Sequence, residues 1–270
     1  MPLDVARLGH PCRVFFLLRC QVFRTPSVDT HRKMATHLKM VKGEPALLLE
    51  ASDGPYLVVA DIHLGASVAS GLSVNDPLQE ARPALERLVG ILEKTGARKL
   101  VILGDIKHSV GNPRQHEAKA ITWLMSRLTD ACRVLFVKGN HDAGVERLLG
   151  ERVFVFGKDG ATIDSVLLLH GNGVPSGFVP DKYDALVLGH MHPHAAGPRG
   201  PEPAWLLYDA LGDVKPRRVV VMPRFSEFLT RAGYGPEEAV PVLKRLDRGS
   251  YRVRYLNLKL EAVEYGAGRI

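Results

Sequence analysis

YLVVADIH at residues 56–63, LVILGD at residues 100–105 and VLFVKGNHD at residues 134–142 share one pattern, an apolar run that stops at acidic, amide or imidazole side chains. Short runs rich in valine, isoleucine and leucine predict strands that are buried on both faces. Two similar runs follow, VLLLH at residues 166–170 and LVLGHMH at residues 186–192. We therefore expect five buried strands whose carboxyl ends carry polar side chains.

Helical periodicity fills the first two gaps between these strands. Asp76 can cap a helix that starts at Pro77 and ends at Gly96, and a second helix fits residues 115–129. Strand, helix, strand, helix and strand in succession predict a βαβαβ core, in which sites form at the carboxyl ends of the strands.

Consecutive strands dominate after residue 150, and the alternation in residues 251–263 predicts one of them. Residues 227–249 are expected to connect strands, with one short helix near residues 237–245. The predicted fold class is therefore α/β, with two packed mixed β-sheets flanked by helices.

The positive charge is concentrated at the start of the chain. The net charge is +7 over 270 residues, yet residues 1–42 hold eight basic and two acidic side chains, and the remainder holds 28 and 27. A basic protein often binds nucleic acid, but here the charge is a weak indicator. We expect residues 1–42 to be a poorly ordered extension, or the product of a misassigned start with initiation at Met34 or Met40. Residues 43–270 are expected to form one domain.

Composition excludes several classes of protein. With 46% hydrophobic and 24% charged residues, the chain is neither disordered throughout, nor collagen, nor a coiled coil. No apolar run approaches the roughly 18 residues that span a bilayer, so we expect no membrane association. Three cysteines are too few for a disulfide framework, and a reducing, cytoplasmic location is expected.

The polar residues at the strand ends predict a metal centre. Burying several carboxylates and imidazoles together is costly unless something pairs with them. Carboxylate, amide oxygen and imidazole suit divalent ions such as Mn²⁺, Fe²⁺ or Zn²⁺. No cysteine lies among these residues, which disfavours a structural zinc site.

The ordered series ADIHLG, LGD, GNHD, HG and GHMH, within residues 60–192, resembles the calcineurin-like metallophosphoesterase superfamily. The resemblance implies two metal ions bridged by Asp105, and a hydroxide between them that attacks phosphorus. It also implies that His141 lies near the leaving oxygen, to stabilise its charge or to protonate it. The implied metal ligands are Asp61, His63, Asp105 and His192 for the first ion, and Asp105, Asn140, His170 and His190 for the second.

His108 departs from the commoner pattern, in which a carboxylate lies three residues after the bridging aspartate. The resulting GD-x-x-H resembles the SbcD-type nuclease branch and the small single-domain phosphoesterases related to it, including those associated with DNA ligases. His108 is either a second catalytic imidazole or a surface residue beside the cleft. The chain has too few residues after the motifs for the DNA-capping domain of the larger nucleases.

Neighbouring polar residues carry weaker expectations. Lys107 and Lys138 either face phosphate or are solvated, and solvation is the favoured reading for each. Asp142 is expected to fix the turn by local hydrogen bonds. His194 is expected to stand near the rim of the site without binding metal.

These observations predict a metal-dependent phosphoesterase, foremost a phosphodiesterase acting on DNA or on nucleotide-like diesters. Single-stranded or flapped DNA is the favoured macromolecular substrate, and Mn²⁺ the favoured ion, with Fe²⁺, Zn²⁺, Ni²⁺ and Co²⁺ as alternatives. A phosphodiesterase or phosphatase for a small nucleotide is the second interpretation, and a non-catalytic binding module is the third. The physiological substrate, the native metal, endonuclease or exonuclease action and the oligomeric state stay open.

Overall fold

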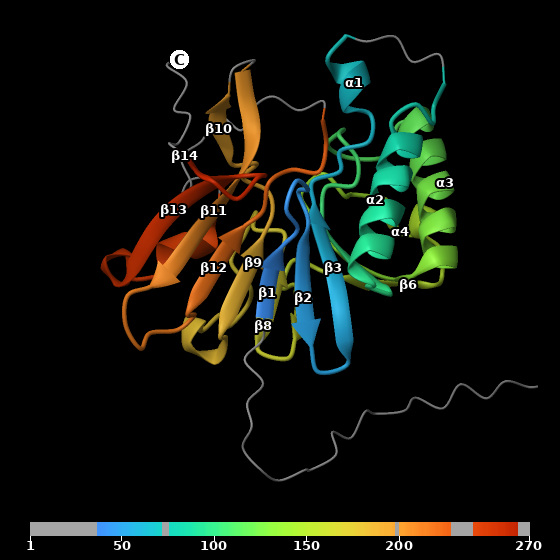
Figure 1. Cartoon of the computed structure of the whole chain (residues 1–270). Helices are drawn as coiled ribbons and strands as arrows, with labels where there is room; N and C mark the ends of the chain where they lie inside the picture. Colours follow the sequence, from blue (N-terminus) through green and yellow to red (C-terminus); the bar gives the residue numbers. More distant parts are fainter. Residues whose placement is uncertain (1–36, 72–75, 198–199, 228–239, 264–270) are drawn as a thin grey trace, which may run out of the picture. The chain divides into compact units, whose positions relative to one another are not determined.

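Residues 37–71, 76–197, 200–227 and 240–263 are described by the computed structural model of the chain (Figure 1). The chain divides into two compact units, residues 1–34 and residues 35–270. All described residues belong to the second unit, and the fold given below is that of this unit.

The first sheet has six strands in the order in which they occur in the chain. The strands are β1 (His37–Met40), β2 (Leu47–Ala51), β3 (Gly54–Ala60), β4 (Lys99–Leu103), β5 (Arg133–Val137) and β6 (Val153–Phe156). Strands β3 to β6 are parallel, whereas β1 and β2 add an antiparallel edge. The predicted apolar runs form β3, β4 and β5, and they are buried because both faces of the sheet are covered.

Helices cover one face of this sheet. The helices are α1 (Ala66–Ala69), α2 (Ala81–Thr95), α3 (Gln115–Ala131) and α4 (Glu146–Leu149). Helix α2 ends where predicted, at Gly96 in the left-handed conformation with φ 69°. Its start at Ala81, later than the expected Pro77, keeps Pro83 in the first turn, where no backbone N–H donor is required.

The second sheet is mixed, with the order β14-β13-β11-β12-β9-β8-β7 and with β10 paired to β11. Its strands are β7 (Ala161–Ile163), β8 (Val166–Leu169), β9 (Ala185–Leu188), β10 (His194–Gly197), β11 (Gly200–Ala210), β12 (Arg218–Val221), β13 (Tyr251–Asn257) and β14 (Ala262–Val263). Three short 3₁₀ helices lie between strands: η1 (Pro180–Lys182), η2 (Pro241–Arg245) and η3 (Arg248–Ser250). Strands β8, β9 and β12 are parallel neighbours.

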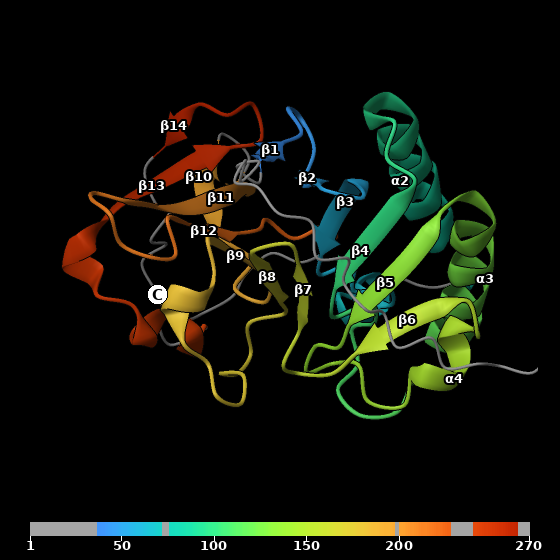
Figure 2. The ribbon, with the colours of Figure 1, turned by 90° about the horizontal axis from the view of Figure 1, so that it is seen from below.

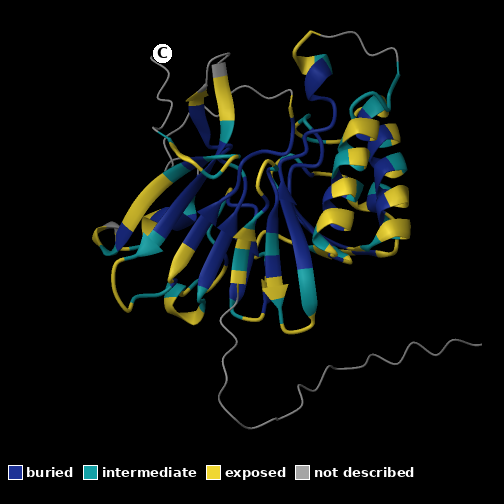
Figure 3. Cartoon of the chain, viewed as in Figure 1, coloured by how far each residue is buried: buried dark blue, intermediate teal, exposed yellow. Residues whose placement is uncertain are grey.

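The two sheets pack face to face, as Figure 2 shows with the helices on the outer side of the first sheet. One core cluster lies between α2, α3 and the first sheet, a second lies between the sheets, and a third covers the outer face of the second sheet. In Figure 3 the strands are mostly buried at the centre of the fold, and the outward faces of α2 and α3 are exposed. The predicted fold class, with two mixed sheets flanked by helices, is confirmed.

Several elements differ from the sequence expectations. Residues 161–169 form a hairpin, because Asp164 takes φ 50° and turns the chain between β7 and β8. Residues 251–263 likewise form two strands, β13 and β14. The short helix expected near residues 237–245 is η2 in its described part, and residues 237–239 lie outside the described residues.

Strand β1 lies inside the segment that the sequence analysis assigned to the N-terminal extension. It pairs with β2, and Leu38 and Met40 pack against the cluster between the sheets. Val41 is buried as well. The folded unit therefore includes residues before the expected boundary at residue 43, because the edge of the first sheet needs a strand there. The division of the chain into an extension and one domain stays a prediction.

Candidate metal centre

The candidate ligands come together because each follows a strand whose carboxyl end faces the same region. Strands β3, β4 and β5 are adjacent and parallel in the first sheet, and β8 and β9 are adjacent and parallel in the second. The residues that follow them are Asp61 and His63 after β3, Asp105 after β4, Asn140 and His141 after β5, His170 after β8, and His190 and His192 after β9. Packing of the two sheets closes these residues into one site.

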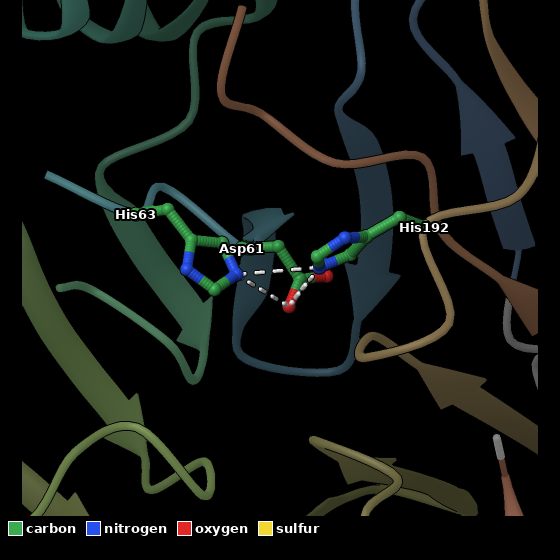
Figure 4. A group of neighbouring side chains, drawn as sticks. All are labelled: Asp61, His63 and His192. Atoms are coloured by element: carbon green, nitrogen blue, oxygen red, sulfur yellow. Dashed lines mark hydrogen bonds and ion pairs between the residues drawn. The ribbon is translucent and has the colours of Figure 1, made fainter. Parts of the chain in front are cut away.

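Asp61, His63 and His192 form the first group of possible ligands (Figure 4). The Nε2 atom of His192 lies 3.3 Å from Asp61 Oδ1 and 3.3 Å from the Nε2 atom of His63. All three side chains are buried, with Asp61 fully inaccessible to solvent. Two imidazole nitrogens and one carboxylate oxygen thus converge at a point where one cation can contact all three.

Asp105 belongs to two further groups, one with His63 and His141 and one with His170 and His190. Its Oδ2 atom lies 3.6 Å from His63 Nε2 and 3.3 Å from His170 Nε2. The ligand atoms of each group lie within 4.8 Å of one another. Asp105 is therefore placed to bridge two ions.

Asn140 lies beside the second of these groups. Its Oδ1 atom is 3.1 Å from His170 Nε2, and the rings of His170 and His190 are 4.9 Å apart between centroids. An amide oxygen is thus available beside the imidazoles. The structure brings together all seven residues that the sequence analysis named as metal ligands.

Backbone strain is concentrated at the same residues. Among the described residues, seven other than glycine have positive φ, and five of these are candidate ligands. They are Asp61, His63, Asp105, His190 and His192, with φ between 48° and 68°. A left-handed backbone is uncommon for residues other than glycine, although aspartate and histidine adopt it more readily than most, and such conformations cluster at functional sites. The left-handed conformation turns each of these side chains away from the direction of its strand and toward the site.

Glycines make room for the ligands. A Cβ atom on Gly104 would lie 2.5 Å from His170 Nδ1, and one on Gly139 would overlap Asp105 Oδ1. Gly104 also has φ 73°, which glycine adopts without strain. The glycines in LGD and GNHD are therefore required by close approach to the ligands.

Two imidazoles are oriented by backbone carbonyl groups. A carbonyl oxygen only accepts hydrogen bonds, so His170 Nδ1–H donates to the Leu103 carbonyl at 2.8 Å, and His141 Nδ1–H donates to that of His108. In the neutral His141 ring the Nε2 atom then keeps its lone pair, whereas His170 Nε2 faces the acceptors Asp105 Oδ2 at 3.3 Å and Asn140 Oδ1 at 3.1 Å. An outer hydrogen bond such as that from Nδ1–H is typical of metal-binding histidines.

The electrostatics of the site favour neutral rings for His63 and His190 beside an ionised Asp105. Burial, with His192 nearby, lowers the pKa of His63 to about 3, and burial with His170 nearby lowers that of His190 to about 4. Burial acts to raise the pKa of Asp105, but the surrounding imidazoles, His170 first, hold it below its usual value. These are the protonation states that metal binding requires.

The two carboxylates attract positive charge into the site. Burial acts to lower the pKa of His170, yet the charges of Asp105 and Asp61 raise it to about 9. Two buried carboxylates with an amide oxygen and four imidazoles suit divalent cations of the first transition row. The donor set, the strained backbone and the glycine cradle all fit a metal centre.

His108 is a member of the site and is half-buried. Its ring centroid lies 5.7 Å from that of His63 and 6.0 Å from that of His141. Its Nδ1 atom is buried without a hydrogen-bond partner, and burial lowers the pKa of the ring. The two readings, a second catalytic imidazole and a histidine beside the cleft, both place His108 here, and its catalytic role stays a prediction.

Lys107 is neither solvated nor directed at a ligand. The side chain is fully buried, and its Nζ atom donates to the carbonyl oxygens of Ser109 and Gly111, each at 2.6 Å, and to that of His141. Both expectations for Lys107 were wrong, because the loop after β4 folds over it. Proximity to Asp105 was the only sequence signal for this role.

The remaining neighbours behave largely as expected. Asp142 accepts hydrogen bonds from the backbone N–H groups of Asp105, Ile106 and Gly139, which confirms that it fixes the turn. Lys138 pairs with Glu146 at the surface. His194, the first residue of β10, is in none of the possible ligand groups among the described residues, although it is buried rather than at a rim.

Sequence analysis missed two buried charged residues near the site. Glu117 accepts hydrogen bonds from the backbone and hydroxyl groups of Ser109 and from the backbone of Arg114, so it orders the loop that follows His108. Arg224 follows β12 and is 4% exposed. Neither stands in a motif, and only the fold brings them to the site.

Comparison with known proteins identifies one family. A family model described as Calcineurin-like phosphoesterase matches residues 54–177. Phosphodiesterase YfcE from Escherichia coli K12 is 30% identical over 123 residues, which cover 44% of this chain and 67% of that protein.

Two solved structures are similar to the chain. The crystal structure of Pseudomonas putida nuclease MPE has 19% identity and a TM-score of 0.49, covering 83% of this chain and 98% of that one. The structure of YfcE has 21% identity and a TM-score of 0.40, covering 79% and 99%. Among the described residues, no helix has the length and apolar character needed to cross a membrane.

Proposed function

Because the chain belongs to the calcineurin-like phosphoesterase family of metal-dependent enzymes, we propose that it is a phosphodiesterase that uses two divalent ions. The observation that carries the proposal is the position of Asp105, which belongs to two of the three possible ligand groups. A carboxylate shared in this way is what a two-ion site needs. We further propose Mn²⁺ as the ion and a reducing, cytoplasmic setting.

The ligands divide between the ions according to their neighbours. Asp61, His63 and His192, with Asp105, would hold the first ion, and Asn140, His170 and His190, again with Asp105, would hold the second. When bound, the ions would neutralise the phosphoryl oxygens and activate water for attack on phosphorus. Left-handed backbone conformations at the strand ends orient ligands of both sets, and the hydrogen bond from His170 to the Leu103 carbonyl orients one ligand of the second.

We propose that His141 acts on the leaving oxygen. Its Nδ1–H donates to the His108 carbonyl, and its backbone N–H donates to Asp105 Oδ1 at 2.9 Å, so the ring is held from both ends. The Nε2 atom is then free to hold a proton and give it to the leaving oxygen. The His108 ring lies 6.0 Å from that of His141, and we propose that it contacts the second ester arm of a diester.

Two observations support a diester substrate. Two imidazoles stand beside the ligand groups, enough to contact both ester oxygens that flank one phosphorus. The relative that matches at 30% identity is named a phosphodiesterase. Within this class we favour single-stranded or flapped DNA, with a small nucleotide diester as the second candidate.

A matrix of metals and substrates tests the proposal. Purified protein is loaded with Mn²⁺, Mg²⁺, Zn²⁺ or Ni²⁺ and supplied with a generic diester, a generic monoester, a cyclic nucleotide and end-labelled DNA. We expect diester turnover that Asp105→Asn abolishes, which also controls for contaminating enzymes. Monoester turnover without diester turnover would contradict the proposal.

The DNA arm separates the two candidate substrates. Residues 43–270 hold 28 basic and 27 acidic side chains, so few phosphates can be neutralised at once. The affinity for DNA should then fall only shallowly with salt, at roughly 0.7–0.9 log units per contacted phosphate for each log unit of salt. We expect endonucleolytic nicking with little processivity. Intact DNA beside a hydrolysed cyclic nucleotide would assign the small diester instead.

A further inference from the structure

Arg224 is a buried charged residue, and two of its guanidinium nitrogens have no hydrogen-bond partner among the described residues. Its side chain is 4% exposed, and both Nε and Nη1 are buried with no hydrogen-bond acceptor. Among the described ion pairs, none includes this guanidinium. A buried arginine normally forms several hydrogen bonds, since the cost of removing its charge from water is otherwise uncompensated.

The segment that carries Arg224 is fastened to the strand ends of both sheets. The backbone N–H of Met222 donates to Leu188 at the end of β9, and the N–H of Phe225 donates to Ala60 at the end of β3. The next N–H, of Ser226, donates to the carbonyl of Asp61 itself at 3.1 Å. The backbone around Arg224 is thereby held beside Asp61, at the ends of β3 and β9.

The Asp61 carboxylate influences the pKa of Arg224, but no described ion pair joins the two side chains. Burial lowers the pKa of Arg224, and the carboxylate of Asp61 opposes that effect. Asp61 already faces His192 at 3.3 Å, and the backbone N–H of His190 donates to its Oδ2 at 3.0 Å.

An anion that enters the site with the substrate supplies the missing acceptor. Two divalent ions would exceed the charge of the carboxylates Asp61 and Asp105, and Arg224 adds another positive charge. A phosphoryl group is negative and offers non-bridging oxygens, which a planar guanidinium binds through paired N–H donors.

We propose that Arg224 binds the phosphoryl group of the substrate, donating hydrogen bonds to its non-bridging oxygens. This assignment rests on the proposed phosphoesterase function and adds a residue beyond the motif span of residues 60–192. It also explains why a charged side chain is kept in a buried position. Packing alone would be served better by an apolar residue of similar volume.

The test compares Arg224→Gln and Arg224→Lys with the unmodified, Mn²⁺-loaded protein. Inorganic phosphate is the probe, measured as an inhibitor of diester hydrolysis and by the rise in melting temperature that it causes. Arg218→Gln is the matched control, because Arg218 begins β12, at the opposite end from Arg224, and pairs with Asp209 at 2.8 Å.

For Arg224→Gln we expect the inhibition constant of phosphate and the KM for diester to rise about 10- to 100-fold, the range for a hydrogen bond to a charged group. Arg224→Lys should show a smaller rise, because lysine has no planar fork. The phosphate-induced rise in melting temperature should shrink in both variants and persist in Arg218→Gln. Without phosphate, Arg224→Gln should melt no lower than the unmodified protein, because it removes an unpaired buried charge.

Two results overturn the assignment. The first is an inhibition constant for phosphate that is unchanged in a variant that folds. The second is loss of bound metal from the variant, which would show that Arg224 holds the metal ligands in position. Failure of the proposed function is separate, since it would appear as absence of diester turnover in the unmodified protein. A phosphate-induced shift that depends on Arg224 would then still support an anion site.

Discussion

His141 and His108 lie on the same side of the candidate centre but are held differently. The His141 ring is fixed through its Nδ1–H, whereas the Nδ1 atom of His108 has no partner. We therefore assign the proton on the leaving oxygen to His141 and a contact with the diester arm to His108. The pair offers a test in which leaving-group ability separates the two roles.

His141→Ala should lower kcat by roughly 10²–10⁴ for a diester with a poor leaving group, as expected for a general acid. Its metal content should stay unchanged, and a leaving group that needs no protonation should restore much of the rate. His108→Ala should have a smaller effect, larger on diesters than on monoesters. Equal losses for good and poor leaving groups in His141→Ala would point to charge stabilisation instead.

Lys107 shows how one buried charge orders a catalytic loop. Its three acceptors include the carbonyl of His141, and removal of the amine leaves all three carbonyls without this donor. Lys107→Met should therefore destabilise the fold by about 3 kcal/mol. That is a fall in melting temperature of about 6–12 °C for a domain of this size.

The control for Lys107 is Lys138→Met. Lys138 follows the neighbouring strand but pairs with Glu146 at the surface, where an ion pair contributes about 0–1 kcal/mol. Differential scanning calorimetry compares the two variants. Similar melting temperatures would show that the carbonyl contacts of Lys107 have little effect on stability.

At the scale of the elements, Asp209 on β11 links three strands of the second sheet. It accepts from Arg218 on β12 at 2.8 Å and from Arg254 Nε on β13 at 3.1 Å. Burial acts to raise the pKa of Asp209, but the hydrogen bonds and charges of Arg254 and Arg218 outweigh it and hold the pKa below the usual value. The ionised form is therefore the one that stabilises the sheet.

Asp209→Asn should lower the free energy of unfolding by about 0.5–1 kcal/mol at pH 7, since the arginines are partly exposed and solvent screens the pairs. A lowered pKa gives stability that is present above the unfolded-state value near ~3.9 and lost as the pH falls through the folded-state value. Urea unfolding should thus show the difference above about pH 5 and its loss toward pH 3. Asp213→Asn, at an exposed pair with Arg217, should show no such dependence.

Strand β1 makes the other prediction at this scale. A chain that starts at Met34 keeps the pairing of β1 with β2 and should retain its melting temperature. A chain that starts at Met40 loses most of β1 and the packing of Leu38 on the cluster between the sheets. Its melting temperature should fall by several degrees. An unchanged value for the Met40 start would show that β1 adds little to the fold.

For the whole molecule, metal binding and folding should be coupled, because the ligands come from five strands in two sheets. Binding to the folded state alone adds about 2.7 kcal/mol at a hundredfold excess over the dissociation constant. Mn²⁺ should therefore raise the melting temperature after chelation, and Asp105→Asn should remove most of this response. Elemental analysis should find two ions per chain, and no more than one would contradict the bridging role of Asp105.

The sequence was sufficient for the fold class and for the candidate ligands. The buried strands β3, β4, β5, β8 and β9 could be recognised because strands covered on both faces form continuous apolar runs. A metal centre could be expected because parallel strands end at one edge, where the polar residues after each run meet, and the individual ligands were those implied by the resemblance of the motifs to the calcineurin-like superfamily. Strands β1 and β10 lack such runs, and the run in β2 is short and is followed by Glu50, so none of the three was predicted.

Tertiary structure alone decided the surroundings of the site. Lys107 is buried because a loop folds over it, and Arg224 reaches the centre because the segment after β12 is hydrogen-bonded to the ends of β3 and β9. Neither contact leaves a local pattern in the chain, since burial of a charge depends on distant segments. Residue type and periodicity therefore identify the candidate metal ligands. Only the packing of the two sheets shows which buried charged side chains lie beside them.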